Sequence, residues 1–161
     1  MNIRSRVITT IATAGFARRV SFAPGTLGSL LGLPIYYVMS FFSLPVVFFA
    51  LMGFIVFASW IAGEAEKALG DKDPGCIVID EIAGMAVTFF ALDFSWTAGI
   101  AGFVLFRFFD ILKPFPIRYL EKRYSGGFGV VIDDVAAGLM SNLVLRIGLL
   151  AAAAIATAPG G

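Results

Sequence analysis

The stretch VSFAPGTLGSLLGLPIYYVMSFFSLPVVFFALMGFIVFASWIAG, residues 20–63, contains no charged side chain. It is too long for one membrane-spanning helix, which needs about 20 apolar residues. Pro45 offers a natural break, because proline cannot continue a helix that precedes it. We therefore predict two helices in this stretch, one near residues 27–42 and the other near residues 45–63.

The apolar pattern continues along the rest of the chain. Three further segments are predicted helices: residues 80 to about 92, residues 96 to about 112, and residues 134 to about 156, with a turn at residues 93–95. Of the 161 residues, 59% are hydrophobic and 14% are charged, whereas a soluble domain has about 45–50% and about 25%. We predict one all-α domain over residues 1–161, a membrane-embedded bundle of four to five apolar helices. The short segments are expected to be tilted or re-entrant.

Basic residues predict how the bundle is oriented. Residues 1–20 are basic and amphipathic and lack the continuous apolar core of a signal peptide, which indicates an arm on the cytoplasmic surface. The connections near Ser43 and Ser95 contain no Lys or Arg. The positive-inside rule therefore places the other connections in the cytoplasm. Their basic residues are Arg4, Arg6, Arg18, Arg19, Lys67, Lys72, Lys113, Arg118, Lys122 and Arg123.

A pair of carboxylates occurs twice in the chain. IVIDEIAGM (77–85) and VVIDDVAAGL (130–139) each lead from β-branched residues into two acids and then into a small, apolar run. A fifth acid lies between them in FRFFDILKP (106–114). An unpaired acid in apolar surroundings costs several kcal/mol. With the predicted orientation all five acids converge at cytoplasmic helix ends: Asp80, Glu81, Asp110, Asp133 and Asp134.

Structural explanations for these acids remain open. Asp80 and Asp133 are suited to cap helix N-termini, and Asp110 can pair with Arg107 or Lys113 three residues away. Capping does not explain the second acid of each pair, so we favour a metal site. The chain has no His and a single cysteine, Cys76. The metal must then be a hard, oxygen-preferring ion such as Mg²⁺ or Mn²⁺.

Two glycine-rich stretches lie beside the acids. In FAPGTLGS (22–29), Thr26 and Ser29 can cap the first helix, and free N–H groups at a helix start attract phosphate. In SGGFGVVIDD (125–134), we predict a loop whose glycines allow the backbone to approach a ligand; a merely flexible loop is the alternative. KPFPIRYLEKRY (113–124) is a cationic corner that can form an interfacial amphipathic helix.

Carboxylates, glycine turns and basic side chains together indicate a phosphate site. Histidine nucleophiles are excluded because the chain contains no His, and no Arg follows Cys76 at the spacing of a cysteine phosphatase loop. The DxDxT/V motif of aspartyl-phosphate enzymes is also missing. A metal-activated water is therefore the favoured nucleophile, and a carboxylate nucleophile is the alternative.

At four ordered motifs the chain resembles the phosphatidylglycerophosphatase A family. These motifs are PGTLGS (24–29), DPGCIVIDEIAG (73–84), FRFFDILKPFPI (106–117) and GGFGVVIDDVAAG (126–138). The resemblance implies a helical, Mg²⁺-dependent lipid phosphatase of the inner membrane. Such an enzyme converts phosphatidylglycerophosphate and water into phosphatidylglycerol and phosphate.

The resemblance also suggests which residues form the site. We assign the metal to Asp80, Glu81, Asp133 and Asp134, with Asp110 as a further ligand or water-orienting base. Arg107 and Lys113 are expected to act on the phosphoryl group. Glu64 and Asp73 are expected to lie behind the metal ligands, and no chemistry is assigned to Cys76. The predicted phosphate-binding residues are Gly25, Thr26, Ser29 and Gly127.

Other functions fit the sequence less well. Intramembrane carboxylates also mark ion- or proton-coupled transporters, but transport sites lie near the bilayer midplane. The Asp motif of CDP-alcohol phosphotransferases does not fit residues 133–136. A net charge of +1 does not indicate nucleic-acid binding. The predicted partners are therefore a phospholipid substrate and the membrane.

Overall fold

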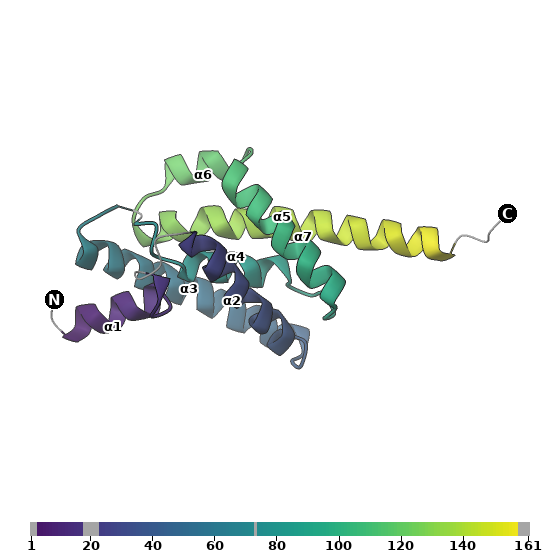
Figure 1. The fold of residues 1–161 in the computed structure, drawn as a ribbon, viewed down its shortest axis with the longest axis horizontal. Coiled ribbons are helices and arrows are strands. Elements are labelled where there is room, and N and C mark those ends of the chain that lie inside the picture. The colour runs from purple at the N-terminus through teal and green to yellow at the C-terminus, as the bar shows by residue number, and fades with distance from the viewer. Residues whose placement is uncertain (1–2, 18–22, 73, 158–161) are drawn as a thin grey trace.

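The computed structural model describes residues 3–17, 23–72 and 74–157. All regular structure in these residues is helical, which confirms the predicted all-α fold (Figure 1). The helices are α1 (Ile3–Ala12), α2 (Pro24–Met39), α3 (Leu44–Leu69), α4 (Ile79–Thr88), α5 (Trp96–Leu112), α6 (Ile117–Arg123) and α7 (Gly126–Thr157).

The described part of the uncharged stretch forms α2 and α3, with the predicted break between them. Pro24 and Pro45 lie in the first turns of α2 and α3, where a missing N–H costs nothing. α3 continues past the predicted end at residue 63 and stops at Gly70. Gly70 has a φ of 72°, the left-handed conformation that commonly ends a helix.

The outside of the bundle is apolar. α3 and α7 are long and apolar enough to cross a membrane, whereas α4 has 10 residues and so a length of about 15 Å. Large side chains project outward: Phe49 is 72% exposed, Val56 71% and Ile100 65%. Exposed apolar surface of this extent is typical of a membrane-facing protein.

α4 occupies the middle of the bundle and contacts α2, α3, α5 and α7. Two glycines that follow the repeated acid pairs let α4 approach α7 closely. A Cβ at Gly138 would overlap the carbonyl oxygen of Gly84, and a Cβ at Gly84 would lie 2.7 Å from the carbonyl oxygen of Asp134. Small residues of this kind let helices meet backbone to backbone. The two copies of the acid motif therefore face each other across one helix crossing.

The predicted loop before the second acid pair is wrong. α7 begins at Gly126 rather than at residue 134, so Asp133 and Asp134 lie about two turns inside a helix and do not cap it. Gly127 is buried against α3, where a Cβ would overlap the Ser59 carbonyl oxygen and the Gly63 nitrogen. Its predicted contact with phosphate assumed a loop; the structure instead uses Gly127 for helix packing.

The far end of α4 is held by polar side chains of α7. Asn142 donates from Nδ2 to the carbonyls of Thr88 at 2.8 Å and Phe90 at 3.0 Å. Arg146 donates from Nη2 to the carbonyls of Phe90 and Ala91, both at 2.8 Å. The last carbonyls of a helix lack intrahelical partners, so these contacts allow a short helix to end inside an apolar bundle.

The N-terminal arm, where it is described, packs on the bundle. Ile8 and Ala12 of α1 are buried against α3, and Arg4 pairs with Glu64 at 3.2 Å. Residues 1–2 and 18–20 of the predicted arm lie outside the described residues. α1 is therefore tied to the same end of α3 that precedes α4.

Candidate metal and phosphate site

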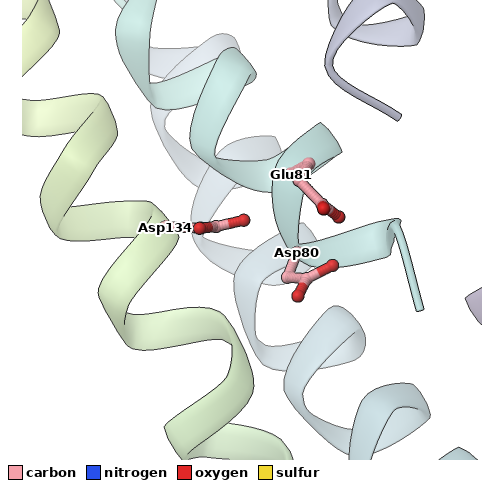
Figure 2. A group of neighbouring side chains, drawn as sticks. All are labelled: Asp80, Glu81 and Asp134. Atoms are coloured by element: carbon pink, nitrogen blue, oxygen red, sulfur yellow. The ribbon is translucent and has the colours of Figure 1, made fainter. Parts of the chain in front are cut away.

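Three carboxylates meet where α4 crosses α7. Asp80 and Glu81 come from the first turn of α4, and Asp134 comes from α7 (Figure 2). One oxygen from each side chain lies within 4.8 Å of the others. Asp80 is 8% exposed and Asp134 is 4% exposed. The structure thus brings together three of the four acids predicted to bind metal; we call them the carboxylate trio.

The trio has the chemistry of a hard-cation site. Asp80 Oδ1 and Glu81 Oε2 are buried and have no hydrogen-bond partner in the described part of the chain. Buried acids this close repel one another and cost several kcal/mol unless a positive charge joins them. Their oxygen-only donor set is the set that Mg²⁺ prefers. The residues present therefore fit a divalent metal ion.

Asp133 is placed differently from its neighbour. Its Oδ2 lies 2.7 Å from Lys113 Nζ, at the end of α5, and Lys113 also contacts Glu121 of α6 at 2.7 Å. Adjacent residues point about 100° apart around a helix, so Asp134 faces the trio while Asp133 faces Lys113. Burial disfavours the ammonium charge, but hydrogen bonds to Asp133 and Glu121 outweigh it and raise the pKa of Lys113. Lys113 is therefore a fixed positive charge.

A second ion pair borders the trio. Arg107 Nη1 lies 2.5 Å from Asp110 Oδ2 and 3.4 Å from Ser29 Oγ. The salt bridge that was one explanation of Asp110 is therefore present. The charge of Asp110 also acts on Glu81 and Asp134. Arg107 Nε is buried without a hydrogen-bond partner in the described residues, which leaves a donor beside the acids.

The start of α2 packs against the site at Gly25. A Cβ at Gly25 would overlap Glu81 Oε1 and lie 3.3 Å from Arg107 Nη1. Fewer backbone N–H groups are free at this helix start than predicted. The N–H groups of Thr26 and Leu27 donate to the Ala23 carbonyl at 3.1 and 3.3 Å. Ser29 caps no N–H group, and its hydroxyl donates to the Gly25 carbonyl at 2.8 Å. The PGTLGS motif therefore contacts the acids through its backbone at Gly25, which lies close to Glu81.

Other sequence predictions fall away from the trio. Glu64 pairs with Arg4 and Lys67, so it ties α1 to α3. Asp73 lies outside the described residues. Glu121 was missed, although it is the only acid in the cationic corner of residues 113–124. A single acid among these basic residues was the sequence feature that could have indicated an ion pair with a neighbouring lysine.

Comparison with known proteins identifies the family. The profile described as Phosphatidylglycerophosphatase A matches residues 7–149. The chain belongs to the phosphatidylglycerophosphatase A family. It is 38% identical over 139 residues to the Escherichia coli (strain K12) phosphatidylglycerophosphatase A, covering 84% of this chain and 80% of that protein. The Haemophilus influenzae phosphatidylglycerophosphatase A is 40% identical over 134 residues, covering 76% and 77%.

A third relative has a different name. A Bacteroides thetaiotaomicron protein called a putative phosphatidylinositol-3-phosphatase is 35% identical over 153 residues, covering 89% of this chain and 95% of that protein. No solved structure matches the chain. All three relatives are named as phosphatases of phosphorylated lipids, the third as a putative one. The profile match and the two phosphatidylglycerophosphatase A relatives confirm the family resemblance seen in the sequence.

The motifs that carry the family resemblance meet at one end of the bundle. PGTLGS begins α2, the second motif leads into α4, FRFFDILKPFPI ends α5, and the last motif begins α7. Gly25 contacts Glu81, the carboxylate trio links the second motif to the last, and Lys113 contacts Asp133. The phosphatidylglycerophosphatase A motifs therefore adjoin one another and form one continuous candidate site.

Proposed function

We propose that this protein is a Mg²⁺-dependent phosphatidylglycerophosphatase of phospholipid synthesis. It hydrolyses the terminal phosphomonoester of phosphatidylglycerophosphate and releases phosphatidylglycerol and phosphate. The carboxylate trio supports this proposal, because its unsatisfied buried oxygens lie beside an arginine with an unused donor. The names of the two phosphatidylglycerophosphatase A relatives supply the substrate.

Asp80, Glu81 and Asp134 would hold the metal ion. When bound, Mg²⁺ supplies positive charge to the phosphoryl oxygens and to the attacking water. Arg107 binds a phosphoryl oxygen through its unused Nε–H, while Asp110 and Ser29 hold the guanidinium in place. Charge-assisted hydrogen bonds of this kind are strong and directional. Arg107 thus orients the phosphoryl group toward the trio.

Asp110 acts as the base that accepts a proton from the attacking water. The water oxygen forms a bond to phosphorus, the bond from phosphorus to the glycerol oxygen breaks, and Asp110 accepts the proton that the water loses. The departing glycerol oxygen takes up a proton from a solvent water to become the hydroxyl of phosphatidylglycerol, and Asp110 later releases its proton to solvent. Lys113 keeps its proton because its pKa is raised, so it stabilises negative charge without donating a proton.

A phosphate-release assay on the purified protein tests this function. Phosphatidylglycerophosphate, phosphatidic acid and phosphatidylinositol 3-phosphate are compared, each with Mg²⁺ and with EDTA. We expect release from phosphatidylglycerophosphate with Mg²⁺, none with EDTA, and recovery when Mg²⁺ is restored. A preference for phosphatidylinositol 3-phosphate would overturn the substrate assignment, and turnover in EDTA would overturn the metal requirement.

Ion- or proton-coupled transport is less well supported. The trio begins in the first turn of α4, beside Arg107 and near the cationic end of α5. A transport site is expected near the middle of the membrane, with access from both sides. The position at one end of the bundle favours hydrolysis of a lipid headgroup at the membrane surface.

We propose that the protein crosses the inner membrane several times with the trio facing the cytoplasm. Lys67, Lys72 and the cations of α6 lie at the trio's end, whereas the turns near Ser40 and Ser95 carry none. Cysteine labelling on intact cells tests this topology in a Cys76→Ser background. Ser125→Cys should resist an impermeant thiol reagent until the cells are opened, whereas Ser40→Cys should react at once. The reverse pattern would contradict the orientation.

A further inference from the structure

A hollow of about 400 Å³ lies between the end of α5 and helix α6. α6 lies across the end of the bundle that begins α7 (Figure 1). The residues around the hollow are both basic and apolar. They include Leu112, Lys113, Phe115, Arg118, Tyr119 and Lys122.

Two of the cations on this hollow are uncompensated. Lys113 is paired with Asp133 and Glu121, whereas Arg118 and Lys122 make no ion pair among the described residues. Arg118 makes one long hydrogen bond, 3.4 Å, to the Leu112 carbonyl. Arg118 and Lys122 are four residues apart and so share one face of α6. No acid lines the hollow, so it has a net positive charge.

The other wall of the hollow is apolar and continues down α5. Phe115 is 82% exposed, Ile111 67% and Leu112 52%. Aromatic side chains beside basic ones are typical of the membrane interface, and exposed aliphatic residues are typical of the acyl-chain region. A phosphate next to Arg118 and Lys122 would therefore have its acyl chains against α5.

We propose that this α5–α6 hollow binds the phosphodiester headgroup of an anionic phospholipid from the surrounding leaflet. Arg118 and Lys122 would bind the phosphate oxygens, since basic pockets at a membrane surface select anionic headgroups. The lipid in this hollow is separate from the phosphomonoester substrate at the carboxylate trio. Lys113 lies on the hollow and also contacts Asp133, so the lipid site adjoins the catalytic one.

Fluorescence quenching by brominated lipids tests the proposal without any turnover. A Phe115→Trp reporter is placed in a Trp60→Phe, Trp96→Phe background and reconstituted with brominated phosphatidylserine or brominated phosphatidylcholine. Phosphatidylserine is neither substrate nor product of the proposed reaction. We expect association with the anionic lipid to be about fivefold or more stronger. Arg118→Gln or Lys122→Gln should each reduce that preference several-fold, and the double variant should abolish it.

Arg123→Gln is the matched control. Arg123 lies on the same helix, over the Tyr124 ring at 5.9 Å, and does not line the hollow. Its removal should leave the lipid preference unchanged. Equal quenching by both lipids in the parent, or an equal loss with Arg123→Gln, would overturn the proposal.

A second measurement avoids the reporter. The chain with its native tryptophans is exchanged from mixed lipid into detergent, and retained phosphatidylserine is quantified by mass spectrometry. Retention should fall in the Arg118→Gln, Lys122→Gln variant and persist in Arg123→Gln; unchanged retention in the double variant would contradict the proposal. Because neither readout uses hydrolysis, failure of the lipid site and failure of the proposed phosphatase activity are distinguishable.

Discussion

Lys113 Nζ lies 2.7 Å from Asp133 Oδ2, and this ion pair joins the end of α5 to α7. It separates the roles of two neighbouring acids. Asp133 is held by an internal cation, while Asp134 faces Asp80 and Glu81 and makes no ion pair within the described part of the chain. The two acids of the second motif should therefore respond differently to mutation.

Asp134→Asn should remove metal binding, whereas Asp133→Asn should not. Mg²⁺ that binds only the folded protein stabilises it, by about 2.7 kcal/mol at a hundredfold excess over Kd. We expect Asp134→Asn to abolish both this stabilisation and phosphate release. Asp133→Asn should keep the stabilisation and lose part of the rate, because it leaves Lys113 less well held. Thermal unfolding with Mg²⁺ and with EDTA measures the difference, and loss of stabilisation in Asp133→Asn would place Asp133 among the ligands.

Gly25→Ala should impair catalysis without unfolding the protein. The added Cβ would overlap Glu81 Oε1 and displace that carboxylate, and a displacement of about 1 Å at a site can cost about 100-fold in rate. The assay is phosphate release, with Mg²⁺ dependence measured in parallel. Gly53→Ala is the control, because a Cβ there meets nothing within 4 Å. A fully active Gly25→Ala enzyme would show that this close approach is dispensable.

Gly138→Ala should destabilise the bundle. Its Cβ would overlap the Gly84 carbonyl and lie 3.0 Å from Val87 Cβ, and overpacking of this kind costs about 1–3 kcal/mol. Gly148→Ala on the same helix has open space around its Cβ and should be neutral or stabilising. Unfolding midpoints in detergent compare the two variants; equal midpoints would mean that α4 and α7 separate readily.

Arg146→Ala should loosen the far end of α4. It removes the guanidinium hydrogen bonds to the carbonyls of Phe90 and Ala91 and a 2.8 Å bond to Asn142. The Phe90 carbonyl keeps its bond from Asn142, and hydrogen bonds from a charged group contribute about 1.5–3 kcal/mol each. Arg146→Lys keeps the charge but not the planar donor geometry, so its stability should be intermediate. Hydrogen exchange at residues 85–91 localises the effect. Unchanged protection in Arg146→Ala would argue against this role.

Local rules predicted much of the fold. The helix at residues 96–112 was predicted with its observed bounds, because Ser95 accepts a hydrogen bond from the Ala98 N–H as a helix cap and Lys113 ends the helix in the left-handed conformation. The break at Pro45 was also correct. The predicted start of α7 was wrong. Glycines that are flexible in isolation are favoured in a helix that packs closely on Ser59 and Gly63.

Composition and residue order alone established an apolar helical bundle with acids, cations and glycines at one end, and the four motifs established the family. These properties depend on residue type and on spacing along the chain, so they can be predicted without knowing the tertiary structure. The partners of each acid depended on the crossing of α4 and α7. Asp134 joins Asp80 and Glu81 while Asp133 joins Lys113, because one residue turns a helical side chain by about 100° and only packing determines which face meets which neighbour.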